Sequence, residues 1–286
     1  LPQLGSLAKR DSQNIWKVSN GQIEIKFFGP GTLVPSSEMF AAVASGVIDA
    51  AYSSPESWAD KEPALQLFSG VPFGPSSGEY LAWVYFGGGQ ELLNEIYHPH
   101  GIQSVLCGMI APEASGWFRH SYTTPEDLLG LKMRTSGLGS KVLNKLGVET
   151  HTLQDEDIFL ALENGKIDGA EFSMPAIDLK LGFHHLAGHY YFPGWHQPSS
   201  FFELIINKDR WDTLTITEQT QIETVCGDNI RYGLAEGEAL QYDALKELTA
   251  KGVTIKRWPV AILSALEDAW REVAIEESLT NPKFKD

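Results

Sequence analysis

The residues with the clearest chemical potential begin with an arginine at the end of a predicted strand. Arg134 ends the stretch LKMR, and the small-residue loop TSGLGS that follows opens a predicted helix. Arginine offers a planar fork for a carboxylate, and the free N–H groups at a helix start add partial positive charge. The pattern predicts an anion-binding site. The alternative is a surface arginine paired with an acid.

Acidic, aromatic and amide side chains occupy other predicted loops. Glu171 ends the strand before FSMP and is either solvated or able to hold a cation. Glu113 lies in MIAPEASGW, a loop after another strand, where an acid at the surface of the loop is the simpler interpretation. Trp195, His196 and Gln197 lie in PGWHQPSS, between prolines. Such groups in a rigid loop suit the wall of a ligand site. The alternative is a core tryptophan in a structural turn.

One short pattern occurs twice in the chain. ASGVIDAAYSSP and ENGKIDGAEFSMP align on Gly46 and Gly165. Unless the match is due to chance, each half contains a helix that ends at glycine, a short strand and a polar loop. Glycine just past a helix readily takes the left-handed conformation. Tyr52 and Glu171 then occupy equivalent strand ends, where open α/β sheets bind ligands, and a cleft between two lobes is expected.

The elements that must position these residues alternate between strands and helices, which predicts an α/β fold with largely parallel sheets. The predicted strands are 22–28, 47–53, 101–110, 131–136, 148–153, 200–207 and 253–258. Helices are predicted at 36–45, 78–98, 137–147, 154–164 and 217–250. The glycine run at 87–89 is expected to break a helix, and Gly227, Gly233 and Gly237 to bend or break the last one.

Composition and charge exclude several classes of function. The 286 residues suit one large domain or two lobes. A net charge of -15 and a pI near 4.9 argue against nucleic acid and anionic membranes as partners. No run of about 18 apolar residues exists, so no membrane insertion is expected. The start LPQLGSLAKR lacks a signal-peptide core, which indicates either a cytoplasmic protein or a processed form.

Neither the cysteines nor most of the histidines point to a metal site. Cys107 and Cys226 are interpreted as buried small side chains, with a disulfide left open. His184, His185 and His189 lack an evident further ligand for zinc.

Six segments, which cover nearly the whole chain, resemble the DctP-type solute-binding proteins of TRAP transporters. They are GPGTLVPSSEMFAAVASGVIDAAYSSPESWADKEPALQLFSGVPFG, LAWVYFGGGQELLNEIY, CGMIAPEASGWFR, LKMRTSGLGSKVLNKLG, KIDGAEFSMPAIDLKLGFHHLA and YFPGWHQPSSFFELIINKDRW. They are most similar to the branch that captures 2-oxo acids and lactate with a metal ion. The resemblance implies a secreted, periplasmic receptor without enzymatic activity. It would capture a small organic acid and deliver it to the TRAP membrane permease.

The resemblance also implies a two-lobed α/β fold with a central ligand cleft and a long lobe-spanning helix. The first lobe is expected at 1–108 plus 201–235, and the second at 109–200 plus 236–286. The chain would begin after the family's usual first strand, near its first helix. Tyr52 and Phe73 are expected to form the wall of the first lobe.

The family's functional positions fall on particular residues of this chain. The arginine that clamps the ligand carboxylate falls on Arg134, and the acidic and aromatic pair that meets cation and ligand falls on Glu171 and Phe172. Relatives often carry tryptophan in place of Phe172, so the wall is kept without its indole donor. The last cation contact falls on Gln197, with Glu203 as a weaker rival.

Glu113 departs from the family, because relatives often carry glutamine at this position. Two carboxylates near one point are costly, and one tends to stay protonated. Either Ca²⁺ or Na⁺ lies between Glu113, Glu171 and Gln197, or an ammonium of an amino acid or amino-sulfonate does, or Glu113 points away. A hydrolase or lyase with an acid/base pair of carboxylates and a sensor domain of the same fold remain the alternative functions.

Overall fold

The computed structural model describes residues 2–286, with side chains described from Gly5 onward, and it contains two compact units. Unit 1 comprises the residues up to Ser69, Ser77–Ile110 and Ser200–Glu236. Unit 2 comprises Gly70–Ser76, Ala111–Ser199 and Gly237–Asp286. Each unit is therefore assembled from three separate stretches of the chain.

Unit 1 is built on an antiparallel sheet of three strands in the order β1-β8-β2. These are β1 (Ala50–Ser53), β2 (Ile102–Ile110) and β8 (Ser200–Asn207). Every residue of the central β8 is buried, which confirms the buried strand predicted at 200–207. The helices of unit 1 are α1 (Pro2–Val18), α2 (Met39–Ala44), α3 (Ser77–Phe86), α4 (Gly89–Tyr97), α8 (Lys208–Thr213) and α9 (Ile216–Ala250) as far as Glu236, with short 3-10 turns at Ser36–Glu38, Pro55–Trp58, Pro63–Phe68 and His98–His100.

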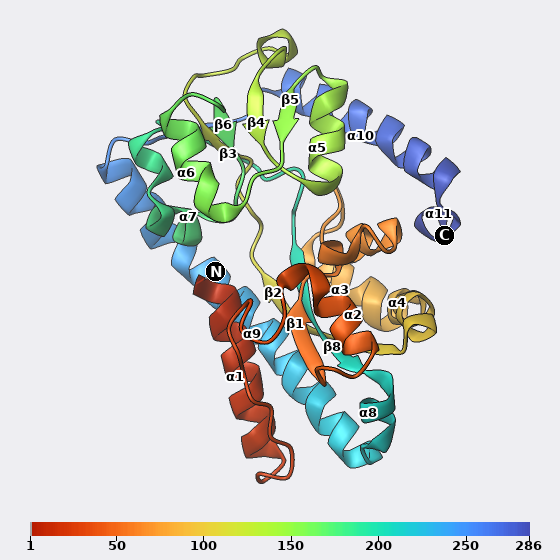
Figure 1. Cartoon of the computed structure of the whole chain (residues 1–286). Helices are drawn as coiled ribbons and strands as arrows, with labels where there is room; N and C mark the ends of the chain where they lie inside the picture. Colours follow the sequence, from red (N-terminus) through yellow and green to blue (C-terminus); the bar gives the residue numbers. More distant parts are fainter. Residues whose placement is uncertain (1) are drawn as a thin grey trace. The chain divides into compact units, whose positions relative to one another are not determined.

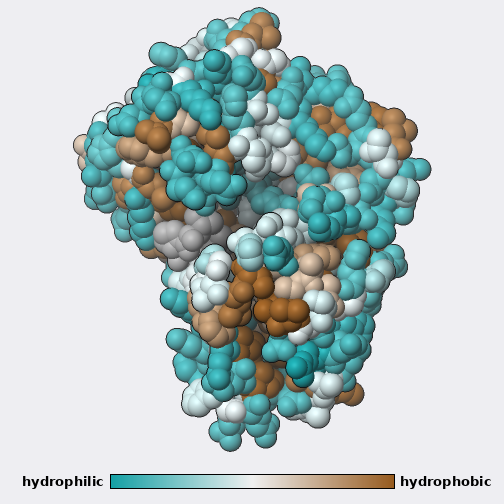
Figure 2. All heavy atoms as spheres, in the orientation of Figure 1, coloured by the Kyte–Doolittle hydropathy of each residue, from teal (hydrophilic) through white to brown (hydrophobic). Residues whose placement is uncertain are grey.

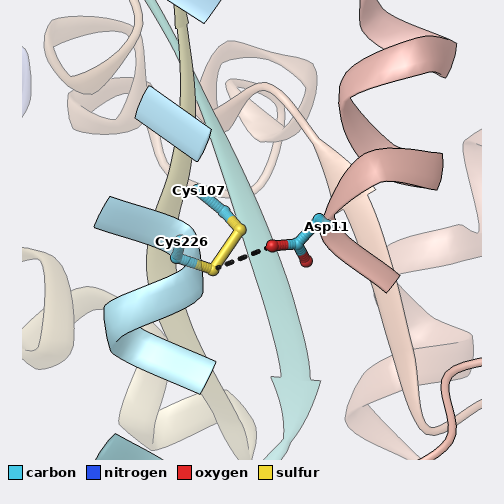
Figure 3. Close-up of side chains that lie close together, drawn as sticks. All are labelled: Asp11, Cys107 and Cys226. Atoms are coloured by element: carbon cyan, nitrogen blue, oxygen red, sulfur yellow. Dashed lines mark hydrogen bonds between the residues drawn. A yellow bond between two sulfur atoms is a disulfide. The ribbon is translucent and has the colours of Figure 1, made fainter. Parts of the chain in front are cut away.

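A disulfide joins β2 to α9 within unit 1 and answers the question that the sequence left open. Cys107 and Cys226 are bonded and fully buried. Figure 3 shows Asp11 of α1 beside them, with its Oδ1 atom 3.8 Å from Cys226 Sγ. Since a disulfide sulfur carries no proton, a hydrogen bond between these atoms requires Asp11 to be protonated and to donate. The disulfide links elements that lie far apart in the sequence.

Unit 2 contains a mixed sheet of six strands in the order β5-β4-β6-β3-β7-β9. Its strands are β3 (Gly116–Phe118), β4 (Lys132–Arg134), β5 (Glu149–His151), β6 (Gly169–Ala170), β7 (His189–Phe192) and β9 (Thr254–Arg257). Its helices are α5 (Gly137–Lys145), α6 (Asp155–Glu163), α7 (Pro175–Leu181), the end of α9, α10 (Val260–Thr280) and α11 (Pro282–Lys285), with 3-10 turns at Pro125–Leu128 and Phe183–His185. The predicted α/β class is confirmed.

Alternate residues of the central strands face opposite sides of this sheet, as the pleat of a strand requires. Phe118 and Tyr191 join an apolar cluster with residues of α5 and α10. Trp117 and Tyr190 join another cluster, which includes residues of α6 and the end of α9. Figure 1 shows α5 and α10 to one side of β4 and β6, and α6 and α7 to the other. Helices therefore cover both faces and hold the strand ends in place.

The repeated sequence pattern forms two turns with the same backbone geometry. Gly46 has a φ of 74° and Gly165 a φ of 73°, so both take the predicted left-handed conformation. In each turn the isoleucine two positions after the glycine donates its backbone N–H to a carbonyl of the preceding helix. Ile48 N donates to Ala42 O at 3.2 Å, and Ile167 N donates to Ala161 O at 3.2 Å. Both turns therefore end their helices with the same hydrogen bond, a pattern shared by many helices that end at glycine.

Several predicted elements differ from the structure. The predicted strand 22–28 pairs with no other strand; Ile23 and Ile25 pack against the apolar cluster of unit 1 instead. The predicted helix 78–98 is two helices, because Gly88 has a left-handed φ of 90° between them. The expectation of largely parallel sheets is wrong for unit 1, where both strand pairs are antiparallel. Unit 2 mixes both orientations.

The long helix α9 is unbroken, so of the two outcomes expected at its glycines, a bend or a break, the break does not occur. A side chain at Gly233 would place Cβ only 2.6 Å from Met109 O. This glycine therefore allows β2 to approach the helix closely. The low helix propensity of glycine suggests a break at Gly233. Close packing against β2 explains why a glycine stands there in a continuous helix.

The described residues include no helix that combines the length and the apolar character needed to cross a bilayer. Hydrophilic residues make up much of the face seen in Figure 2, with apolar residues among them.

Candidate metal and anion site in unit 2

Two neighbouring parallel strands bring Arg134 and Glu171 together. Arg134 is the last residue of β4, and it lies opposite Ala170 of β6. Glu171 follows β6 directly, and its N–H donates to Arg134 O at 2.9 Å. Parallel strands end at the same edge of a sheet, so the two side chains emerge from adjacent positions. The sheet pairing thus explains why residues 37 positions apart meet.

Loop-to-loop hydrogen bonds place Glu113 at the same edge. Its N–H donates to Gln197 O at 3.3 Å, and the next residue, Ala114, donates its N–H to Ser173 O at 3.1 Å. The backbone at Gly194 lies so close that a Cβ atom there would be 2.1 Å from Glu113 O. Glycine is therefore required at 194 for this loop to reach Glu113.

The imidazole of His196 lies between the two buried carboxylates. Its Nε2 atom is 3.6 Å from Glu113 Oε2 and 3.6 Å from Glu171 Oε1, and each of the three side chains is only 7% exposed. These distances are too long for hydrogen bonds. Glu113 Oε2 and His196 Nε2 have no hydrogen-bond partner among the described residues. The three groups form a cluster of the kind that can hold a metal ion.

Arg134 occupies the side of the cluster nearest Glu171. Its Nη1 atom donates to Glu171 O at 2.6 Å and lies 3.4 Å from Glu171 Oε2. Its Nη2 atom lies 3.8 Å from the exposed carboxylate of Asp155, and the guanidinium stands 5.5 Å from the centre of the Phe172 ring. The buried Nε atom has no partner. Buried donors are rarely left without a partner, and an anionic ligand would supply one.

The two carboxyl groups differ in acidity because their neighbours differ. Burial raises the pKa of Glu113, and the negative charge of Glu171 raises it further. The neighbouring imidazole of His196 lowers it, but by less. Burial opposes ionisation of Glu171 too, but His196 and Arg134 outweigh it and hold the pKa below its usual range. Burial alone would lower the pKa of His196, yet the two carboxylates raise it to about 9. Of the two carboxyl groups, Glu113 is therefore the one that holds its proton more tightly.

Aromatic residues line the neighbourhood of the cluster. Phe73 N donates to Trp195 O at 2.7 Å, and the two rings stack with centroids 5.6 Å apart. Phe172 makes an edge contact with Phe183. Beside the cluster is a small, mostly apolar cavity lined by Ser115, Phe118, Leu128, Leu131, Met133, Thr135, Leu143, Glu171, Trp195, His196, Trp258 and Leu266.

Phe73 requires a correction to its predicted place in the first lobe. The segment Gly70–Ser76 belongs to unit 2, because Phe73 packs on Trp195 there. Its φ of 53° is unusual for a bulky residue. The backbone hydrogen bond to Trp195 holds this conformation. A role for Phe73 in contacting ligand stays a prediction.

Two other residues that the sequence singled out lie in unit 1. Tyr52 donates its hydroxyl to Cys107 O at 3.3 Å and stacks on Phe202. Glu203 accepts hydrogen bonds from Tyr97 and Ser104, both at 2.6 Å, and burial raises its pKa to about 7. These contacts satisfy the polar groups of Glu203 within unit 1, so it is a poor rival to Gln197 for a cation. The ligand role of Tyr52 stays a prediction.

Sequence reasoning noticed His196 in its loop but assigned it no part in the site. The structure brings its imidazole, one residue before the predicted ligand Gln197, against both carboxylates. Sequence spacing cannot decide which of two adjacent side chains in a proline-flanked loop points inward. Ser173 was also missed; its hydroxyl lies 3.5 Å from Glu113 Oε1.

Several proteins are similar to this chain over nearly its whole length. The monocarboxylate 2-oxoacid-binding periplasmic protein of Nostoc sp. is 31% identical over 278 residues, which is 97% of this chain and 76% of that protein. A solved TRAP transporter solute-binding protein from Bordetella bronchiseptica RB50, with copurified calcium and picolinate, is 33% identical with a TM-score of 0.93, covering 100% of this chain and 85% of the other.

A second solved structure, from Colwellia psychrerythraea, holds calcium and pyruvate. It is 28% identical to this chain with a TM-score of 0.91, over 99% of this chain and 87% of that protein. The family model described as bacterial extracellular solute-binding protein, family 7, matches residues 4–278. The chain therefore belongs to this family, DctP, whose members are solute receptors of TRAP transporters and not enzymes.

Proposed function

We propose that this protein captures a small 2-oxo or 2-hydroxy carboxylic acid together with a cation. The observation that carries the proposal is that a positively charged arginine and two carboxyl groups lie at one edge of the unit 2 sheet. Arg134 has an unpartnered Nε donor and pairs with the buried Glu171, which shares a cluster with Glu113. A ligand with a carboxylate next to a carbonyl or hydroxyl oxygen suits such a site. Its negative charge can pair with the arginine, and its oxygens can bind the cation.

The cation requirement follows from the donors that surround it. Carboxylate and amide oxygens are ligands for calcium and sodium, and Glu113, Glu171 and Gln197 are the proposed set. Glu113 Oε2 has no hydrogen-bond partner, and buried polar atoms are rarely left so. A bound cation would satisfy it. Similar proteins are described with sodium and pyruvate, or with calcium and pyruvate.

Aromatic side chains complete the proposed site. Phe172, Trp195, Phe73 and Tyr52 are the proposed walls. Family membership supports the remaining steps, in which the receptor works outside the cytoplasm, encloses its ligand and delivers it to a TRAP permease. The disulfide supports an oxidising compartment such as the periplasm.

Thermal melting of the metal-stripped protein tests this function. Pyruvate, 2-oxobutyrate, lactate and an amine-bearing acid are each added with Ca²⁺, with Na⁺ or with no cation. A ligand at about one hundred times its dissociation constant adds roughly 2.7 kcal/mol of stability, which raises the melting temperature by several degrees. The expected shift requires both the acid and a cation. A shift produced only by an amine-bearing acid without metal would favour the ammonium alternative and contradict the proposal.

Variants locate the response within the site. Glu171→Gln should abolish the joint shift, since it removes the charge that binds the cation, and Arg134→Lys should weaken it by loss of the planar fork. Glu163→Gln is the matched control, because this glutamate is exposed at the end of α6. An undiminished shift in Glu171→Gln would rule the proposed site out.

A further inference from the structure

A buried carboxyl group lies against the disulfide of unit 1. Asp11 of α1 is only 2% exposed, and its Oδ1 atom lies 3.8 Å from Cys226 Sγ (Figure 3). Cys226 and its partner Cys107 are fully buried. Aspartate is seldom buried unless it is paired, and here the atom within hydrogen-bonding reach is a sulfur. Ligand capture does not use this carboxyl group, so its place beside the disulfide needs another explanation.

The polar groups around Asp11 have partners of their own. Arg10, the preceding residue, pairs with Asp228 of α9. Tyr52 of β1 donates its hydroxyl to Cys107 O at 3.3 Å. Burial, and to a lesser extent the charge of Asp11, raises the pKa of Tyr52, so the phenol stays neutral. Of the described groups around Asp11, the two sulfur atoms are therefore the ones whose chemistry can change.

The state of the sulfur atoms decides what the carboxyl group can bond to. A disulfide has no proton to donate, and burial raises the pKa of Asp11 to about 7 against the attraction of Arg10. A thiol is different, because its S–H group can donate a hydrogen bond to a carboxylate. A hydrogen bond to the charged form of an acid lowers the pKa of that acid. Opening of the disulfide should therefore make Asp11 a stronger acid.

We propose that Asp11 couples the opening of the disulfide to pH, because it gives up its proton when the bond opens and takes it back when the bond forms. The reductant is a small dithiol, which becomes a disulfide itself. Its two electrons break the S–S bond, and its two protons end on Cys107 and Cys226 as S–H groups. Asp11 then changes from an acid that donates to sulfur into a carboxylate that accepts from Cys226, and its proton passes to the solvent. The disulfide is therefore harder to open in acid than near neutral pH.

Contacts between α1, α9 and β2 keep Asp11 in place in either state. The side-chain amide of the buried Asn229 donates to Leu7 O of α1 at 3.3 Å and to Cys107 O of β2 at 2.7 Å. These hydrogen bonds do not involve the sulfur atoms, so they can persist after the disulfide opens. The folded, reduced protein thus keeps the Asp11 carboxylate within reach of the Cys226 thiol.

Carbon NMR of the Asp11 carboxyl group tests the proposal on the wild-type protein. The ¹³C-labelled chain is titrated between about pH 4 and about pH 8, once oxidised and once with excess dithiol, and backbone connectivities assign the signal. Reduction should weaken the binding of the Asp11 proton at least about tenfold, which is the worth of a hydrogen bond to a charged group. This measurement needs no variant.

Two results of this titration would overturn the proposal. One is a proton that Asp11 binds equally tightly, or more tightly, in the reduced protein. The other is loss of the dispersed spectrum of a folded protein on reduction, because the coupling requires α1 to stay docked beside the two thiols.

The equilibrium with the dithiol gives a second readout. Below about pH 8, where free thiols are protonated, exchange between a disulfide and a dithiol releases no net proton. The wild-type equilibrium should nevertheless move at least about tenfold toward the reduced form between about pH 4 and about pH 8, because release of a proton is favoured at high pH. Asp11→Asn should give a flat profile. Equal profiles for the two proteins would contradict the proposal.

Glu203→Gln is the matched control for a buried carboxyl group in unit 1. Burial raises the pKa of Glu203 to about 7 as well, but its carboxylate accepts from Tyr97 and Ser104 and does not face sulfur. This variant should keep the pH dependence of the wild-type equilibrium. Loss of the dependence in Glu203→Gln as well as in Asp11→Asn would refute the role assigned to Asp11.

Discussion

At the scale of single residues, the same type of side chain takes different charge states because its neighbours differ. Glu113 and Glu171 lie beside the same imidazole, but only Glu171 also faces a guanidinium. The pKa of Glu171 is accordingly lowered and that of Glu113 raised. The site therefore contains one strong and one weak acid, which the sequence alone cannot distinguish.

Asp11 carries a prediction about pH at this scale. Burial raises its pKa from 3.8 to about 7, against the attraction of Arg10. The folded state thus holds the proton that the unfolded state releases near pH 4. Stability should fall as the pH rises from about 4 to about 7, and should then level off.

Asp11→Asn removes this titration and tests the sign. The variant should be more stable than the wild-type protein at pH 8, by at most about 4 kcal/mol, and the difference should shrink toward pH 4. Urea denaturation at several pH values measures it. Because the buried amide also needs partners, the diagnostic quantity is the change in the difference with pH. Parallel stability curves for the two proteins would disprove the raised pKa.

At the scale of elements, the loop after β7 depends on a glycine. An alanine at 194 would place its Cβ 2.1 Å from Glu113 O, so the backbone must shift. Gly194→Ala should destabilise the fold by about 1–3 kcal/mol. It should also reduce the ligand-induced melting shift, since Glu113 moves.

Gly188, on the other side of β7, supplies the matched control. A Cβ atom there meets nothing within 4 Å, and its φ is not left-handed. Gly188→Ala should change the unfolding free energy by no more than about 0.5 kcal/mol and leave ligand response intact. Similar effects of both substitutions would show that the close approach at Gly194 is unimportant.

At the scale of the whole molecule, the disulfide is the longest-range covalent link in the described chain. Cys107 and Cys226 are 119 positions apart and both belong to unit 1. Replacing both with alanine should lower the unfolding free energy by about 2–5 kcal/mol, mainly because the unfolded chain gains freedom. Chemical denaturation under oxidising conditions measures the loss.

The location of the disulfide adds a check on function. All residues of the proposed metal cluster belong to unit 2, so the double variant should still bind Ca²⁺ where it remains folded. Loss of metal binding in a folded double variant would contradict this independence. An unchanged denaturation midpoint would show that the disulfide contributes no stability.

The α/β class, the buried strand 200–207, the two glycine turns and the family could all be predicted from the sequence. These features depend on local signals: apolar runs, left-handed glycines and segments long enough to be specific. The position of Arg134 at a strand end was also readable, because it follows directly from the pattern LKMRTSGLGS.

Strand direction, the cysteine pairing, the place of Phe73 in unit 2 and the position of His196 could not be predicted from the sequence and come from the folded structure. Each depends on partners that lie far away in the sequence: β8 sets the direction of its neighbours, α9 brings Cys226 to Cys107, and three loops bring His196 between Glu113 and Glu171. Local patterns cannot carry this information, because packing and pairing are chosen among distant segments after the elements have formed.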